Sequence, residues 1–154
     1  MASAKKKITI NVSQGDFYKI ITDYNSYPKF LSTVRRVKIR ERSKDTAIVE
    51  FEAKVVKTFR YVLELTGTKD SGLRWKLVEG EFMRKNEGRW ILKVKSKNCI
   101  EATYSISVEL GRLVPGFVAK LLVEESLPKT LEEFKKRAET LAEKPGPTKK
   151  QSTN

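Results

Sequence analysis

The sequence predicts an α+β domain in which a curved, seven-stranded antiparallel sheet wraps around one long C-terminal helix, with two short helices after the first strand. Two observations predict this class. Between residues 33 and 109, apolar and polar side chains alternate in six successive runs joined by short polar turns, which is typical of an antiparallel meander with one apolar face. After Gly111 the apolar side chains recur at helical spacing, and only this segment is long enough to cover the sheet.

The first strand and the two short helices are expected within residues 8–31. Ile8, Ile10 and Val12 alternate with polar residues, as in a strand. Ser13 is expected to begin the first helix, with Asp16 three residues later as an acidic variant of the capping box. The apolar residues that follow at helical spacing are Phe17, Ile20, Ile21 and Tyr24. Residues 25–28 (NSYP) end this helix because proline disrupts it, and residues 29–31 can form one further short turn.

Each of the six alternating runs is expected to form one strand. The residues that share the apolar face are Val37 and Ile39; Ala47, Val49, Phe51, Ala53 and Val55; Tyr61, Leu63 and Leu65; Leu73, Trp75 and Leu77; Trp90, Leu92 and Val94; and Ile100, Ala102, Tyr104, Ile106 and Val108. The turns between the runs include residues 43–45 (SKD), 69–72 (KDSG) and 85–88 (KNEG), whose residue types favour chain reversal.

The long helix is expected to begin near Pro115, where a first-turn proline is tolerated. Its apolar stripe consists of Phe117, Val118, Leu121, Leu122, Leu127, Leu131, Phe134 and Leu141. Pro128 interrupts the stripe and is expected to kink the helix or to split it in two. The folded domain is therefore expected at residues 8–143, between a flexible basic segment at residues 1–7 and a disordered tail at residues 144–154.

The composition of the 154-residue chain excludes several classes of site. It has no histidine, which rules out a Ser-His-Asp triad, a Cys-His dyad and every metal site that needs a histidine ligand. Its single cysteine, Cys99, rules out an intrachain disulfide and a CxxC motif, and it is interpreted as a small, partly buried residue rather than a nucleophile. No metal and no cofactor are expected. No apolar run of signal-peptide length follows the basic start, so a cytoplasmic location is expected.

The net charge of +13 suggests an anionic partner, but its location weakens that interpretation. Residues 1–7 and 144–154 together carry six of the excess cations and no carboxylate. A row of outward-facing lysines at positions 93, 95 and 97 has no obvious acidic partner before Glu101. General surface basicity is the favoured interpretation, and the alternative is an encounter surface for an anionic membrane or a ribosome, without specific recognition of DNA.

The hairpin that turns near residue 44 is expected to neutralise part of its own charge, because residues on one face pair directly across an antiparallel hairpin. The expected pairs are Lys38 with Glu50 and Arg36 with Glu52, and the cations left unpaired are Arg40 and Arg42.

Four segments of the chain resemble a known family. They are residues 23–31 (DYNSYPKFL), 75–82 (WKLVEGEF), 88–90 (GRW) and 113–115 (LVP). Together with the order of the predicted strands and helices, these segments resemble the START-like (SRPBCC) superfamily, in particular its polyketide cyclase/dehydrase branch. That branch includes coenzyme Q-binding proteins and the ribosome-association toxin family. The resemblance covers about residues 5–140. It implies a helix-grip fold with a hydrophobic cavity between the sheet and the long helix, which binds lipids, quinones or aromatic polyketides.

The resemblance also implies that inward-facing residues line this cavity. The candidates are Phe51, Leu63, Trp75, Phe82, Trp90, Tyr104, Val118, Leu121 and Leu122. Each of them could instead fill an ordinary core; the aromatic residues favour the cavity, because buried indole N–H and phenol O–H groups need polar partners. Tyr24 and Tyr27 are expected at the cavity mouth or, with equal weight, as packing residues around the turn at Pro28.

These residues favour a protein that binds a hydrophobic small molecule reversibly, as a carrier or sequestering protein. A first alternative is a polyketide cyclase or dehydratase, which needs a proton donor and acceptor beside its substrate. Arg60 and Tyr104 are the candidate catalytic residues for that reaction, with Tyr61 beside them in an internal polar site. A second alternative is a ribosome-associated factor that binds through the lysine row at positions 93, 95 and 97.

Overall fold

The computed structural model describes residues 2–143 and contains the seven strands and the C-terminal helix that the sequence predicts. The strands are β1 (Ala2–Ile10), β2 (Val34–Arg42), β3 (Thr46–Lys54), β4 (Thr58–Thr68), β5 (Gly72–Gly80), β6 (Met83–Ser96) and β7 (Cys99–Leu110). The helical elements are α1 (Gln14–Thr22), the 3-10 turn η1 (Tyr24–Ser26), α2 (Tyr27–Phe30), α3 (Gly116–Leu121), the π-helical turn η2 (Leu122–Ser126) and α4 (Leu127–Glu143).

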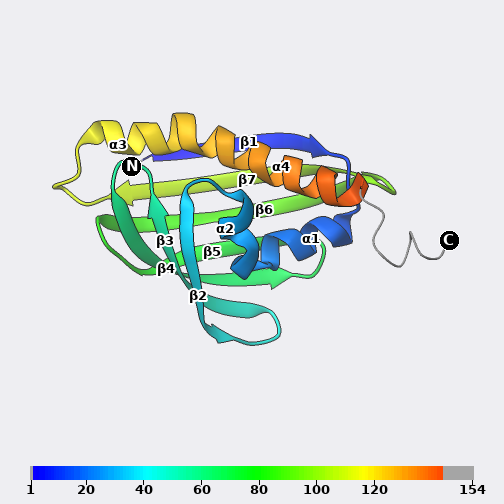
Figure 1. The fold of residues 1–154 in the computed structure, drawn as a ribbon, viewed down its shortest axis with the longest axis horizontal. Coiled ribbons are helices and arrows are strands. Elements are labelled where there is room, and N and C mark those ends of the chain that lie inside the picture. The colour runs from blue at the N-terminus through cyan, green and yellow to red at the C-terminus, as the bar shows by residue number, and fades with distance from the viewer. Residues whose placement is uncertain (1, 144–154) are drawn as a thin grey trace.

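All seven strands form one antiparallel sheet in the order β1-β7-β6-β5-β4-β3-β2. The meander from β2 to β7 is the predicted one, and β1 adds to its edge beside β7. Figure 1 shows α3, η2 and α4 as one long rod running along the curved sheet, with α1 toward the end opposite α3 and α2 near the middle. The predicted class and architecture are therefore confirmed. No helix in residues 2–143 has both the length and the apolar character needed to cross a membrane.

The first strand begins at Ala2, so residues 2–7 are a strand and not the expected flexible segment. Ala2 lies opposite Val108 of β7, and the register continues without irregularity to Ile10 opposite Ile100. The lysines at positions 5–7 hide this strand from pattern analysis, but backbone hydrogen bonding to the edge of β7 requires no apolar alternation. The tail expected at residues 144–154 lies outside the described residues.

The start of α1 is the predicted one. The Asp16 backbone N–H donates to the Ser13 hydroxyl at 3.2 Å, which satisfies one of the N–H groups that a helix leaves unpaired at its start. Phe17 and Ile21 then face the sheet and are fully buried. With Ile10, Val49, Ile100 and Leu131 they form the most deeply buried part of the core. This end of the space between sheet and helices is filled.

The C-terminal helix is divided next to Pro128, as predicted. The Leu127 N–H donates to the Leu122 carbonyl, five residues earlier, which makes η2 a π-helical turn. Pro128 has no N–H and its ring crowds the turn before it, so the wider π turn accommodates it. α4 buries Leu127, Leu131, Phe134 and Ala138, whereas α3 and η2 contain no buried residue. Within the C-terminal helix, α4 is therefore the part that packs firmly.

Candidate functional site

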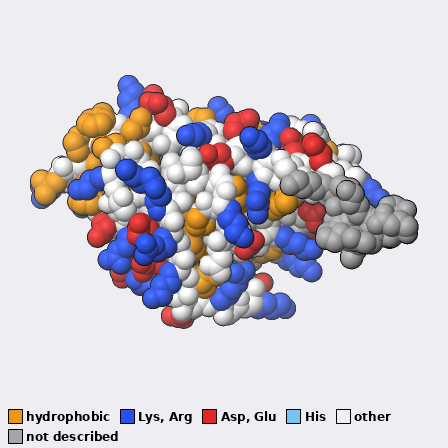
Figure 2. Space-filling view, viewed as in Figure 1, with side chains coloured by type: hydrophobic (Ala, Val, Ile, Leu, Met, Phe, Trp, Pro, Cys, Tyr) orange, Lys and Arg blue, Asp and Glu red, His pale blue; other side chains and the backbone are white. Residues whose placement is uncertain are grey.

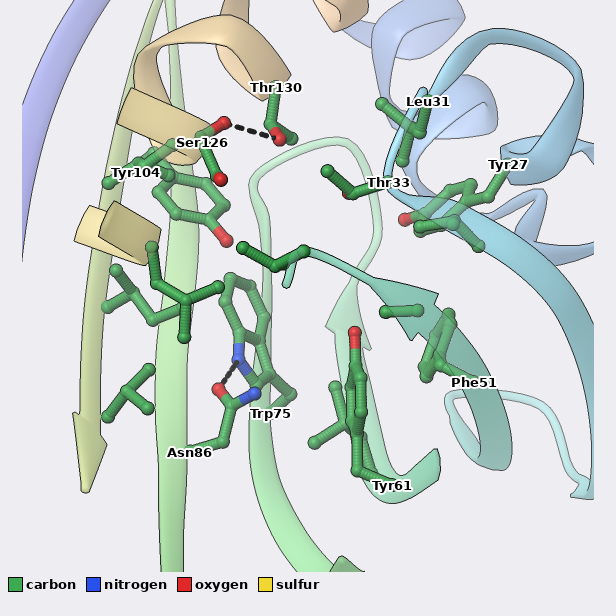
Figure 3. Close-up of a pocket in the computed structure, with 18 of the residues that line it drawn as sticks. Tyr27, Leu31, Thr33, Phe51, Tyr61, Trp75, Asn86, Tyr104, Ser126 and Thr130 are labelled. Atoms are coloured by element: carbon green, nitrogen blue, oxygen red, sulfur yellow. Dashed lines mark hydrogen bonds between the residues drawn. The ribbon is translucent and has the colours of Figure 1, made fainter. Parts of the chain in front are cut away.

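A cavity of about 170 Å³ lies between the sheet and the junction of η2 with α4. Figure 3 shows side chains from the sheet, from α2 and from the C-terminal helix converging on it. The lining residues on which the argument depends are Tyr27, Phe51, Tyr61, Leu63, Trp75, Asn86, Trp90, Tyr104, Leu122, Ser126, Thr130 and Phe134. The interior is therefore hollow at this end of the molecule and filled at the α1 end.

The structure brings seven of the eleven predicted ligand-binding residues to this cavity. They are Tyr27, Phe51, Leu63, Trp75, Trp90, Tyr104 and Leu122. The other four lie elsewhere. Tyr24 is buried beneath η1, where its ring meets that of Tyr27 with centroids 5.8 Å apart. Phe82 is exposed in the turn between β5 and β6 because its backbone has a positive φ of 59°.

Val118 and Leu121 are absent from the cavity lining because the helix is not continuous. A π turn contains one extra residue, which rotates the preceding segment by about 100° relative to the helix that follows. The predicted apolar stripe assumed one continuous helix, so its prediction for the residues of α3 is wrong. Val118 lines a separate surface groove instead.

Asn86 is the polar residue of the cavity that the sequence pattern missed, because residues 85–88 were expected to form a turn. In the structure they belong to β6, and regular alternation with Trp90 and Leu92 directs Asn86 inward. The Trp75 indole N–H donates to the Asn86 side-chain carbonyl at 3.0 Å, and the Asn86 amide contacts the Met83 sulfur at 3.7 Å. A buried amide and a buried indole therefore satisfy each other. The sequence did carry one indication of Asn86: Trp75 was predicted to face inward, and its buried indole N–H needs a hydrogen-bond acceptor nearby.

Gly88 lets the Trp75 ring lie directly on β6. A Cβ at position 88 would clash with Trp75 and with the Ser105 carbonyl of the neighbouring strand. Gly88→Ala is therefore expected to lower the free energy of unfolding by about 1–3 kcal/mol and to change tryptophan fluorescence. Urea denaturation measures the loss. The matched control is Gly116→Ala, because a Cβ there meets nothing within 4 Å; equal stability of the two variants would contradict the packing described.

Two tyrosine hydroxyl groups point into the cavity. Figure 3 shows Tyr61 and Tyr104 directing their oxygens toward the same space from different strands. Neither hydroxyl takes part in a side-chain hydrogen bond within residues 2–143, whereas the Tyr27 hydroxyl donates to the Ile21 carbonyl. Burial raises the pKa of Tyr61 to about 12 and raises the pKa of Tyr104 further. Both phenols are therefore protonated at neutral pH and can donate hydrogen bonds to a ligand.

None of the described residues that line the cavity is charged. Its other polar groups are hydroxyls and the Asn86 amide, and the Thr130 hydroxyl already donates to the Ser126 backbone carbonyl at 2.9 Å. A charged ligand group would lose its hydration here without an ionic partner, at a cost of several kcal/mol. The site therefore favours an uncharged molecule.

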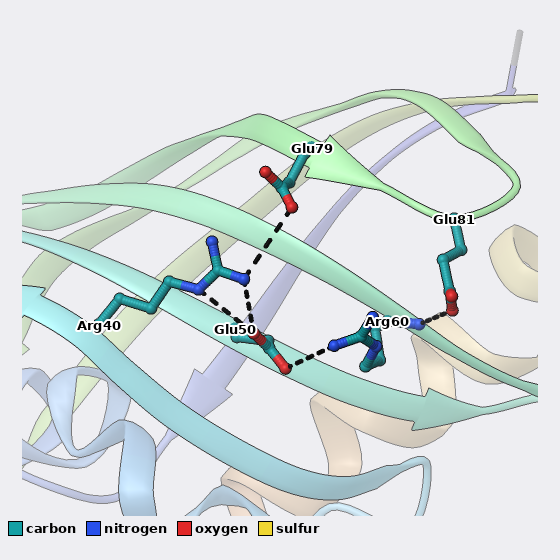
Figure 4. A network of polar contacts seen from close by, with 5 residues as sticks. All are labelled: Arg40, Glu50, Arg60, Glu79 and Glu81. Carbon is teal, nitrogen blue, oxygen red and sulfur yellow. Dashed lines mark hydrogen bonds and ion pairs between the residues drawn. The ribbon is translucent and has the colours of Figure 1, made fainter.

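Arg60 does not join Tyr104 in an internal polar site, so its predicted catalytic placement is wrong. It alternates with Tyr61 on β4 and lies on the outer face of the sheet, where its guanidinium is 3.3 Å from Glu50 (Figure 4). Arg40 contacts the other oxygen of Glu50 at 2.7 Å, and its hydrogen bond holds the pKa of that carboxyl below its usual value. This network stabilises the outer surface only.

The predicted hairpin register is confirmed, but the ion pair is a different one. Lys38 lies opposite Glu50 and Arg36 opposite Glu52. An irregularity between Ile39 and Glu41 brings Arg40 to Glu50 instead. Of the two arginines expected to be unpaired, Arg40 is thus paired, and Arg42 lies over the Tyr24 ring at 5.2 Å and donates to the Thr22 carbonyl.

The remaining candidates lie away from the cavity. Cys99 is half-buried at the start of β7, Lys93 and Lys95 are exposed near the end of β6, and Lys97 is exposed in the turn that follows. In the part of the chain that the structure describes, no three cysteine, aspartate or glutamate side chains lie close enough to bind a metal together.

A model of the family described as "Polyketide cyclase / dehydrase and lipid transport" matches residues 10–135. A search of curated proteins finds no match. Among solved structures, a START superfamily protein from Mycobacterium smegmatis is 17% identical, with a TM-score of 0.80 over 90% of this chain and 98% of that one.

Two further solved structures are similar. The Zhui aromatase/cyclase from Streptomyces sp. R1128 is 13% identical, with a TM-score of 0.81 over 94% of this chain and 98% of that chain. A STAR-related lipid transfer protein from Xanthomonas axonopodis is 14% identical, with a TM-score of 0.70 over 88% of this chain and 85% of that chain. At these identities the likeness shows a shared fold.

Proposed function

The chain belongs to the polyketide cyclase / dehydrase and lipid transport family, and from that premise we propose that it binds an uncharged, ring-containing small molecule in its cavity, as a carrier or sequestering protein. The ligand would belong to the lipids, the quinones or the aromatic polyketides. The observation that carries this proposal is the pair of tyrosine hydroxyls, Tyr61 and Tyr104, that face a largely apolar cavity whose described lining carries no charge.

The lining favours a ring with a carbonyl or another hydrogen-bond acceptor. The rings of Trp75 and Trp90 lie 5.3 and 4.8 Å from that of Tyr104, so a ligand would meet aromatic surfaces on several sides. Apolar contact would supply most of the affinity, while the two phenol O–H groups would select ligands with an acceptor. Quinones and aromatic polyketides carry such acceptors.

The size of the cavity suggests how a larger ligand would enter. A hollow of about 150 Å³ holds one benzene molecule, so the cavity of about 170 Å³ accommodates little more than one ring without movement. η2, which buries no residue, covers its side nearest Leu122, and α3, which also buries none, leads into η2. Displacement of this weakly packed segment would enlarge the space while α4 stays in place.

A polyketide cyclase or dehydratase is the second candidate, favoured by the same two hydroxyls. Two phenol O–H groups could stabilise the negative charge that develops on a substrate carbonyl oxygen. No carboxylate, lysine or arginine is among the described lining residues, and the raised pKa of each tyrosine makes it a poor base at neutral pH. The structure therefore favours binding over turnover, and turnover of an enolisable polyketide analogue would overturn this preference.

Matched ligands test the binding proposal. α-Tetralone carries a carbonyl acceptor and tetralin lacks it, and quenching of the chain's two tryptophans, both in the cavity lining, reports binding. Tyr61→Phe and Tyr104→Phe are each expected to weaken binding of α-tetralone about tenfold, the value of one hydrogen bond, while binding of tetralin stays unchanged.

The control for this experiment is Arg60→Ala, which alters only the outer face of the sheet and should leave both affinities unchanged. Circular dichroism verifies that each variant is folded. Equal losses for both ligands would show that the hydroxyls do not select an acceptor, and failure of the wild-type protein to bind either ligand would overturn the proposed function.

A further inference from the structure

We propose that an exposed apolar patch beside the cavity docks on the surface of an anionic lipid bilayer. This mouth patch consists of Val56, Phe82, Leu113 and Phe117. The inference deepens the proposed function and rests on it, because it assigns the bilayer as the place where the cavity exchanges its ligand.

The four residues of the mouth patch are far more exposed than apolar side chains of this size usually are. Their exposed fractions are 50% for Val56, 46% for Phe82, 97% for Leu113 and 62% for Phe117. All four line one groove of about 220 Å³, although they come from three separate loops and from α3. Figure 2 shows hydrophobic side chains gathered at the end of the molecule where Figure 1 places α3. Clusters of this kind mark interaction surfaces.

The backbone of Phe82 supports a role for its exposed ring. Its φ of 59° lies in the left-handed region, which is unfavourable for a bulky side chain. This conformation directs the ring into the groove on the surface and away from the cavity. The Lys57 ammonium lies 4.3 Å from the centre of the ring. Aromatic rings with adjacent cations are typical of groups that settle at a membrane interface.

The charges around the mouth patch complement anionic lipid. Lys57, Arg112 and Lys120 are exposed, and none of the three forms an ion pair within residues 2–143. The carboxylate that lines the same groove, Glu81, accepts the Arg60 backbone N–H at 2.8 Å. Basic residues beside an apolar surface increase its affinity for anionic headgroups. A second copy of the chain fits less well, because a symmetric contact would place these cations against one another.

The mouth patch is continuous with the cavity. Its groove and the cavity share Val55, Phe59 and Leu122 as lining residues. The cover between them is formed by α3 and η2, the part of the C-terminal helix that buries no residue. Insertion of Leu113 and Phe117 into a bilayer would therefore place the weakly packed α3 and η2 at the lipid surface. An apolar ligand could then pass directly from the lipid to the cavity.

Flotation with lipid vesicles tests this docking. The wild-type protein is expected to float with phosphatidylcholine vesicles that contain phosphatidylglycerol and to bind pure phosphatidylcholine more weakly. Leu113→Ser and Phe117→Ser are each expected to weaken binding to the anionic vesicles about tenfold, because each removes an apolar side chain from the interface. The matched control is Val94→Ser, since Val94 is 58% exposed at the far end of β6, and it should bind as the wild type does.

The contribution of charge is tested separately. Lys57→Gln is expected to weaken binding to the anionic vesicles about fivefold, whereas Lys95→Gln on the far end of β6 changes it little. Added salt should reduce the difference between these two variants. Equal losses for both would mean that overall charge, and not the mouth patch, attracts the protein to lipid.

Three results would overturn the docking proposal: no vesicle binding, equal binding by Leu113→Ser and Val94→Ser, or a dimer that Phe117→Ser dissociates while vesicles bind no protein. The α-tetralone titration without lipid separates this failure from failure of the proposed function. Normal titration with no vesicle binding rejects only the membrane, whereas vesicle binding with no titration rejects the cavity ligand.

Discussion

Raising the pH above about 10 is expected to unfold the protein over a narrow pH range. Burial raises the pKa of Tyr24 to about 12, raises that of Tyr27 well above its usual value, and raises that of Tyr104 above that of Tyr24. The folded state thus favours the neutral phenol. Its contribution to stability is complete below the unfolded-state pKa near 10 and is lost as the pH rises toward the folded-state values. Each such tyrosine lowers the free energy of unfolding by about 1.4 kcal/mol per pH unit in this range.

Three buried tyrosines together give a slope of about 4 kcal/mol per pH unit, a large part of the 5–15 kcal/mol that stabilises an ordinary domain. Deprotonation of lysine acts in the opposite direction, because it reduces the repulsion of a chain with a net charge of +13. The measurement is a joint titration of tyrosinate absorbance and circular dichroism. The two signals should change together in one cooperative step. Gradual ionisation of the tyrosines near pH 10 with unchanged circular dichroism would show that they are open to solvent.

The strand pattern was predictable because most of one face of the sheet is buried, although Val94 at its end is exposed. Phe51, Leu63, Trp75, Trp90 and Tyr104 follow the period of two, so their convergence under the helix could be read from the sequence. The hairpin partners of Lys38 and Arg36 followed from the same rule. Alternation determines which face a side chain occupies wherever the register is regular.

Most of the misplaced residues lie where regular geometry is interrupted; Arg60 is the exception, because it lies in a regular strand and alternates with Tyr61. An irregularity in β2 brings Arg40 to Glu50, and Asn86 was missed because residues 85–88 belong to β6 and not to the expected turn. A left-handed residue in the turn after β5 exposes Phe82, and the π turn η2 rotates Val118 away from the cavity. Each interruption changes the direction of nearby side chains by one residue position or by a fraction of a helical turn. Local amino-acid composition does not determine where such interruptions occur. The cavity itself depends on how completely side chains fill the space, and that is a property of the packed structure.

The aromatic ring of Phe134 joins α4 to both the sheet and the short helices, and its removal is expected to cause the largest loss of stability of any variant proposed. Phe134 is 3% exposed. Its ring centroid lies 5.3 Å from those of Phe30 and Trp90 and 5.5 Å from that of Tyr27. Phe134→Ala is expected to lower the free energy of unfolding by about 3–5 kcal/mol, since the surrounding rings cannot close the space.

The matched control is Phe117→Ala, which removes the same ring from the exposed surface of α3 and should change stability by less than about 0.5 kcal/mol. Urea denaturation compares the two variants. Because Phe134 lines the cavity, its removal also enlarges the hollow, so tetralin should bind Phe134→Ala more tightly than the wild type and restore part of the lost stability. Equal stability of the two variants would show that this cluster does not hold α4 on the sheet. A destabilised Phe134→Ala that no apolar ligand restores would show instead that the structure collapses into the space.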